Sequence, residues 1–160
     1  MHTMKPTLYL ETSVVSYYTA RPSRDILVAV HQQITRRWWD RDLDEYEVFV
    51  SQLVIKEASE GDPEAAKKRL EAMASFAVLD FTPEADRLAA TYARRIPMLE
   101  ADIRDAAHVA TATMNEVDYL VTWNCAHIAS AETRRAVIRE NERLGKATPM
   151  ICTPEELMRP

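Results

Sequence analysis

Short apolar runs alternate with long stretches of helical periodicity along this chain, and that alternation constrains the fold more than any other feature. The apolar runs cover residues 7–10, 48–50, 76–79 and 119–122, with a weaker fifth at 150–152. Strands that alternate with helices are typical of parallel sheets, and nearly continuous apolar strands are covered on both faces. The sequence therefore predicts an α/β fold with a central parallel sheet of four to five strands between two layers of helices.

Several of the expected helices have a start signal with a known mechanism. A serine, threonine or aspartate before the first turn accepts a hydrogen bond from a free backbone N–H, and a proline fits the first helical position. The expected caps are Ser23, Ser51, Asp62, Thr82 and Thr153. The helix after Ser23 is expected to end near residues 40–42.

Composition limits the chain to one globular domain, which we place at residues 1–160. The chain has 160 residues, a net charge of −5 and a pI near 5.4. A net negative charge argues against broad electrostatic binding to nucleic acid or anionic membranes. The longest run without Asp, Glu, Lys or Arg, residues 119–131, is too short to span a bilayer, and no signal-peptide core precedes the first strand. We expect a cytoplasmic protein without a membrane partner.

Glycine and cysteine usage narrows the chemistry further. Gly61 and Gly145 are the only glycines, which excludes a glycine-rich phosphate loop and a dinucleotide fingerprint. Cys125 and Cys152 form no CxxC pair, so we expect small, buried, reduced thiols. The chemistry must therefore come from dispersed acids and hydroxyls.

Three acids are the best candidates because ligands of open parallel sheets bind at the carboxyl ends of the strands. Glu11 directly follows the first strand, Glu57 lies on the helix after the second, and Asp105 lies near the start of a later helix. The alternative for each is an ordinary helical acid at the surface or near a helix start. Carboxylates that converge need a cation or raised pKa values, and their hard oxygens suit Mg²⁺ or Mn²⁺.

Other polar residues near these acids have competing interpretations. Asp102 is expected to cap the helix that carries Asp105, and His108 is expected to be a packing residue. Asn124 could hold a water or a phosphate oxygen, or it could cap the following helix. Arg21 and Arg24 are candidate phosphate contacts, or solvated loop charges.

The order of these motifs resembles the PIN domain, in particular the VapC-like ribonuclease toxins of bacterial and archaeal toxin–antitoxin operons. The resemblance is carried by Tyr-Leu-Glu-Thr-Ser at residues 9–13, by residues 51–57, by Asp-Ala-Ala-His-Val-Ala at 105–110 and by Leu-Val-Thr-Trp-Asn at 120–124. It extends over nearly the whole chain, from residue 7 to residue 157. It implies a PIN-like three-layer α/β/α sandwich.

The resemblance also implies site residues and a cofactor. Glu11, Glu57 and Asp105 stand at the metal-ligating acidic positions, where the family binds Mg²⁺ or Mn²⁺. Asn124 stands where many members have a last Asp, and Ser13 and Thr122 match hydroxyl positions that contact water or substrate. Glu11 is one methylene longer than the usual Asp, and Asn124 lacks a charge, which should weaken metal binding.

We therefore expect a Mg²⁺- or Mn²⁺-dependent endoribonuclease for single-stranded RNA, the toxin of a toxin–antitoxin pair. The alternative is a catalytically weakened PIN-like module that binds RNA or a protein partner without turnover. A phosphatase-like hydrolase with Glu11 as acceptor is disfavoured, because Ser13 stands where a second acid is usual. The toxin interpretation implies an antitoxin partner and a homodimer. Trp38 and Trp39 either contribute to such an interface or pack in the core.

Overall fold

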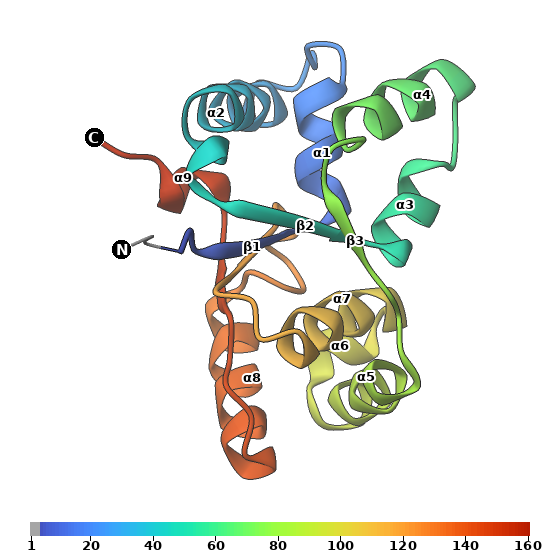
Figure 1. The fold of residues 1–160 in the computed structure, drawn as a ribbon, viewed down its shortest axis with the longest axis vertical. Helices are drawn as coiled ribbons and strands as arrows, with labels where there is room; N and C mark the ends of the chain where they lie inside the picture. Colours follow the sequence, from blue (N-terminus) through green and yellow to red (C-terminus); the bar gives the residue numbers. More distant parts are fainter. Residues whose placement is uncertain (1–3) are drawn as a thin grey trace.

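The computed structural model describes residues 4–160, and its centre is an all-parallel five-stranded sheet (Figure 1). The strand order is β3-β2-β1-β4-β5. The strands are β1 (Thr7–Leu10), β2 (Glu47–Ser51), β3 (Ala77–Leu79), β4 (Tyr119–Val121) and β5 (Met150–Cys152). The expected number, positions and parallel arrangement of the strands are confirmed, with ends that differ by one residue at β2, β3 and β4.

Helices lie on both sides of this sheet. The first group follows β1 and β2, and the second group follows β3 and β4; they occupy opposite sides of the sheet in Figure 1. The first group contains α1 (Thr12–Thr19), α2 (Ile26–Asp42), α3 (Gln52–Ala58) and α4 (Pro63–Ala72). The second contains α5 (Pro83–Arg95), α6 (Pro97–Glu100), α7 (Ile103–Met114) and α8 (Ala131–Leu144). A 3₁₀ turn, Leu43–Glu45, precedes β2, and α9 (Pro154–Leu157) packs against α2. The three-layer α/β/α expectation is confirmed.

The centre of the sheet is buried, but its edge is not. Leu8, Tyr9 and Leu10 on β1 are fully buried, as an inner strand covered on both faces should be. On the edge strand β3, however, Val78 is 49% exposed. The expected burial of both faces therefore holds for β1, holds only at the end of β2, and fails at β3.

The expected helix caps are confirmed with one exception. Ser51, Asp62, Thr82 and Thr153 each accept a hydrogen bond from the first turn of their helix. The prediction of Ser23 as the cap of α2 is wrong: Asp25 Oδ1 accepts from Val28 N at 3.0 Å, and Ser23 Oγ accepts from Asp25 N. Ser23 and Asp25 could both cap this start, and the ionised aspartate is the stronger acceptor of the two.

The apolar residues of α2 divide between the core and the surface. Trp38 is fully buried, and Trp39 stacks on Tyr18 with 4.1 Å between ring centroids. Trp38 therefore lies in the core and Trp39 packs against it, as the second of the two interpretations predicts. The exposed large apolar side chains of this helix are instead Ile26, Leu27 and Val30, at 82%, 65% and 44%.

The two cysteines differ in their surroundings. Cys152 is buried on β5, and burial raises the pKa of its thiol to about 12. Cys125 is exposed, so the expectation that both thiols are buried is wrong. Its position explains this, because it lies in the turn that follows β4 and not on a strand or helix. Among residues 4–160, no helix combines the length and hydropathy that crossing a bilayer requires.

Candidate active site

The sheet order creates a topological switch point beside β1. From β1, the chain builds β2 and β3 on one side and later adds β4 and β5 on the other. Because all strands are parallel, the segments that follow β1, β2 and β4 begin at the same edge of the sheet. A crevice for ligands is expected at this point. Glu11, the start of α3, and Thr122 follow directly after these three strands.

Glu11 is held at the end of β1 by two hydroxyl groups. Thr122 Oγ1 donates to Glu11 Oε1 at 2.7 Å, and Ser13 Oγ donates to the same oxygen. Ser13 Oγ in turn accepts from Trp123 N at 2.9 Å. The carboxylate is 7% exposed, and both bonds reach Oε1. The structure thus gives Ser13 and Thr122 contacts to Glu11, while their substrate contacts stay a prediction.

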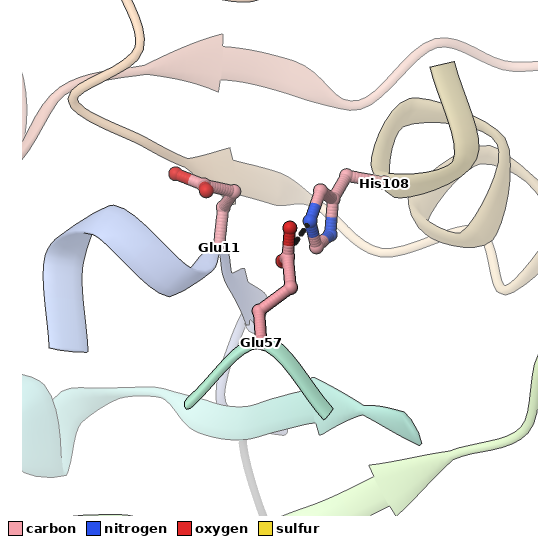
Figure 2. Close-up of side chains that lie close together, drawn as sticks. All are labelled: Glu11, Glu57 and His108. Atoms are coloured by element: carbon pink, nitrogen blue, oxygen red, sulfur yellow. Dashed lines mark hydrogen bonds and ion pairs between the residues drawn. The ribbon is translucent and has the colours of Figure 1, made fainter. Parts of the chain in front are cut away.

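Glu57 lies in the last turn of α3, and its side chain points toward His108 (Figure 2). Thr12 Oγ1 donates to Glu57 Oε1 at 2.5 Å, and His108 Nε2 lies 2.6 Å from that oxygen. Partial burial favours a higher pKa for Glu57, but the hydrogen bond and charge of His108 outweigh it and hold the pKa below its ordinary value. Glu57 is therefore ionised at neutral pH.

His108 lies behind Glu57 and is almost fully buried. Its Nδ1 lies 2.7 Å from the hydroxyl of Tyr9, so both ring nitrogens have partners. Burial favours a lower pKa for His108, but the Glu57 bond and the charges of Glu11 and Asp105 leave the pKa raised. Glu11 and Glu57 lie next to this imidazole, whereas Asp105 is joined to Glu11 through Asn124 and Thr122.

Asp105 lies in the first turn of α7, which Asp102 caps as expected. Asn124 Nδ2 donates to Asp105 Oδ1 at 3.1 Å, and His127 Nδ1 lies 3.1 Å from Oδ2. Desolvation by burial raises the pKa of Asp105, and the His127 bond only partly opposes this. Asn124 also accepts from His127 N at 3.0 Å, which shapes the turn. It caps no helix, because α8 begins later, after Ser130.

The chemistry of the donor set fits a hard divalent cation. Donor atoms of Glu11, Glu57 and His108 lie within 4.8 Å of one another, and Asp105 is close enough for Glu11 to raise its pKa. Both nitrogens of His108 are already engaged, so the oxygens of the three acids are the available ligands. Carboxylate oxygens without thiolates are typical of Mg²⁺ and Mn²⁺ sites.

The predicted phosphate contacts, Arg21 and Arg24, lie in the segment between α1 and α2. Glu11 caps the start of α1, whereas these arginines follow its end. Eight helical residues therefore separate them from the acid cluster. Their contact with a substrate stays a prediction.

Sequence reasoning missed several residues that shape the site. Thr12 and Tyr9 lie close to Glu11 in the sequence. Nothing in the sequence indicates that their hydroxyl groups contact residues of α3 and α7. The sequence favours a packing role for His108, although the spacing Asp105-x-x-His108 already places the imidazole on the same side of a helix as the acid. Arg104 was also missed: it pairs with Asp102 at 3.0 Å, and its charge lowers the pKa of Glu57.

Comparisons with known proteins agree with this architecture. No protein-family model and no curated protein matches the sequence. Among solved structures, VapC20 of Mycobacterium tuberculosis superimposes with a TM-score of 0.61 at 16% identity, covering 78% of this chain and 95% of that chain. The chain has a PIN-like fold.

A second solved structure gives a similar match to this PIN-like domain. A chain of VapBC2 from Rickettsia felis superimposes with a TM-score of 0.57 at 13% identity, covering 92% of this chain and 98% of that chain. VapC20 is described as a toxin that cleaves the sarcin-ricin loop, and VapBC2 as bound to a DNA fragment from its promoter. The PIN-like domain thus corresponds to nearly the full length of both neighbours.

Proposed function

We propose that this PIN-like domain is a divalent-metal-dependent endoribonuclease that cleaves single-stranded RNA. The observation that carries the proposal is the cluster of Glu11, Glu57 and His108 at the switch point of the sheet, with Asp105 joined to Glu11 through Asn124 and Thr122. Hydrogen bonds from residues 4–160 engage only Oε1 of Glu11 and only Oε1 of Glu57. One oxygen of each of these two acids is therefore available to a ligand.

Each acid has a distinct role in the proposed reaction. Glu11 and Asp105 would hold Mg²⁺ or Mn²⁺, and Glu57 would orient the attacking water or a second ion. A bound divalent cation lowers the pKa of that water and offsets charge on the scissile phosphate. Asn124 would act through Asp105, whose Oδ1 it contacts, and through a water. No covalent intermediate is required.

We further propose that this ribonuclease acts as the toxin of a toxin–antitoxin pair. Both structural neighbours carry Vap names, and one is described as a toxin that cleaves the sarcin-ricin loop. We therefore propose an antitoxin that covers the acidic crevice and a homodimer as the assembled form. Complementary charge would suit a basic segment of the antitoxin, because the crevice contains three carboxylates.

Cleavage of a mixed set of short fluorescent RNAs tests the proposed activity. Wild type and Asp105→Asn are compared in EDTA, Mg²⁺ and Mn²⁺, with Asp86→Asn on the exposed face of α5 as a matched control. We expect cleavage by wild type and Asp86→Asn that needs metal, and at least a hundredfold loss in Asp105→Asn with an unchanged circular dichroism spectrum. Equal cleavage by Asp105→Asn would refute the site.

One observation favours a second candidate, a weakened PIN-like module that binds without turnover. Asn124 supplies no negative charge and directs its amide toward Asp105. This arrangement lowers the total charge available to a cation. Titration with Mn²⁺ separates the two functions: if millimolar Mn²⁺ neither stabilises the folded protein nor supports cleavage, the binding module is favoured.

A further inference from the structure

A continuous chain of hydrogen bonds runs behind the acid cluster from α3 through β1 to α7. The hydroxyl of Tyr9 lies 2.8 Å from Ser51 Oγ and 2.7 Å from His108 Nδ1. The other imidazole nitrogen lies 2.6 Å from Glu57 Oε1, the link drawn dashed in Figure 2. The chain therefore begins at the cap of α3 and ends on a carboxylate of the candidate active site.

This chain lies in the interior of the protein. Tyr9 and Ser51 are fully buried, and His108 is 1% exposed. Buried polar groups must be paired, whereas apolar side chains of similar shape would fill the same space without that requirement. Packing alone therefore does not account for three paired polar side chains in a row. What they share is that their hydrogen bonds lead to Glu57.

The same chain fixes both ends of α3. Ser51 Oγ accepts from Val54 N at 3.2 Å and so caps the helix, while Glu57 lies in its last turn. Tyr9 thus contacts the cap of α3 directly and its terminal acid through His108. Thr12 Oγ1 donates to the same Glu57 oxygen at 2.5 Å. The contacts of His108 and Thr12 with Glu57 both involve Oε1, and no hydrogen bond from residues 4–160 reaches Oε2.

His108 can donate Nε2–H to Glu57 whether its imidazole is neutral or protonated. In the neutral ring, Tyr9 donates to Nδ1 and Ser51 can donate to Tyr9. In the protonated ring, Nδ1–H donates to Tyr9, and Tyr9 donates to Ser51. In both arrangements Nε2–H donates to Glu57.

We propose that Tyr9 and His108 are positioning residues that hold Glu57 with Oε1 fixed and Oε2 presented to a cation or water. The inference rests on the proposed function, because the presented oxygen matters only if the crevice binds a ligand. Hydrogen-bond partners of ligating carboxylates tune metal sites, and their loss typically costs about 10–100-fold in metal affinity or activity.

The test compares two replacements of His108 of similar size by calorimetric titration with Mn²⁺. In His108→Gln, the amide nitrogen can take the place of Nε2 and donate to Glu57, whereas His108→Leu has no donor. We expect Mn²⁺ affinity to fall by about 10–100-fold in His108→Leu and to be largely restored in His108→Gln. Wild-type affinity in a folded His108→Leu would overturn the proposal.

Tyr9→Phe provides a second variant if His108→Leu does not fold, because it removes one hydroxyl and keeps the ring. The matched control is Tyr92→Phe, which also removes a fully buried, hydrogen-bonded hydroxyl but lies between α5, α7 and α8. We expect about a tenfold loss of Mn²⁺ affinity in Tyr9→Phe and none in Tyr92→Phe. Equal affinities would show that the Tyr9 hydroxyl is only structural.

A measurement on the metal-free protein separates this proposal from the proposed function. In ¹H–¹⁵N spectra, the His108 Nε2–H should exchange slowly in wild type and be broadened in Tyr9→Phe. If wild type binds no Mn²⁺ but shows this behaviour, the proposed function fails while the positioning of Glu57 is supported. An unchanged Nε2–H signal in Tyr9→Phe would overturn the positioning role itself.

Discussion

The candidate acids Glu11, Glu57 and Asp105 differ in how many hydrogen bonds each of their carboxylate oxygens accepts. Glu11 and Glu57 each receive two hydrogen bonds on one oxygen, whereas Asp105 receives one bond on each oxygen. The two glutamates are thus oriented and keep a free oxygen. For the proposed ligand binding, Asp105 would have to share an oxygen with Asn124 or His127, or lose one of these contacts. Burial raises the pKa of Asp105, and the hydrogen bond with His127 only partly offsets this effect.

The pair of Glu57 and His108 predicts a pH dependence of stability. The pKa of Glu57 lies below its ordinary 4.5, so its contribution exists above pH 4.5 and is lost as pH falls through the folded value. The pKa of His108 lies above its ordinary 6.5, so its contribution exists below pH 6.5 and is lost as pH rises through the folded value. The pair therefore stabilises most between these two values.

Thermal unfolding of wild type and Glu57→Gln from pH 4 to pH 9 measures this effect. The difference in melting temperature should be largest between pH 4.5 and 6.5 and should decrease on both sides. Comparing the two proteins at each pH removes the effect of other titrating groups. A difference that is constant with pH would contradict the pairing.

At the scale of elements, α7 connects the site to the helical layer behind it. Its buried face carries Ala106, Val109 and Ala110, small side chains that let the helix approach the sheet. Asp105 and His108 lie beside this face and reach the crevice. Behind α7, the hydroxyl of Tyr92 on α5 contacts Thr113 at 3.1 Å and Asn141 on α8 at 2.5 Å. One tyrosine therefore ties three helices together.

Loss of the Tyr92 hydroxyl should destabilise this layer. Tyr92→Phe leaves Asn141 Oδ1 buried without this donor, and an unsatisfied buried polar group costs about 1–3 kcal/mol. Urea unfolding measures the change in the free energy of unfolding. Tyr18→Phe is the control, because its hydroxyl bonds Asp40 near the surface and its removal should cost less than about 1 kcal/mol. Equal losses would argue against the role of Tyr92 between the helices.

At the scale of the whole molecule, the sheet collects acidic groups that are far apart in sequence. Thr122 and Glu11, which share a hydrogen bond, are 111 positions apart, and His108 and Glu57 are 51 positions apart. The crossovers of the parallel sheet bring these segments to one edge. The resulting concentration of negative charge costs free energy in the absence of a cation.

A cation that binds this edge should therefore stabilise the whole fold. Binding to the folded state alone contributes about 2.7 kcal/mol at a hundredfold excess over Kd, or roughly 5–10 °C in melting temperature for a domain of this size. Scanning calorimetry with EDTA or Mn²⁺ measures this shift. The shift should shrink in Glu11→Gln, which keeps the shape of the side chain and removes its charge. Equal melting temperatures of the wild type in EDTA and in Mn²⁺ would contradict the proposed metal site.

The sequence predicted those parts of the molecule that depend on local chemistry. The strand at Thr7–Leu10 and the caps at Asp62 and Thr153 are set by side chains within a few residues of each other. Glu11 could be predicted as a site residue because it directly follows a buried strand. The expected cap of α2 at Ser23 is wrong because two capping residues, Ser23 and Asp25, compete within three positions, and local rules do not rank them by their final geometry.

Only the tertiary structure decided which side chains meet. His108 could have been an ordinary packing residue on α7, and the sequence gives no measure of its distance from Tyr9 or Glu57. These contacts depend on the order of the strands and on how closely α7 and α3 approach β1, which follows from the packing of the whole core. Periodicity and capping act over a few residues, whereas the hydrogen bonds of the site join positions that only folding brings together.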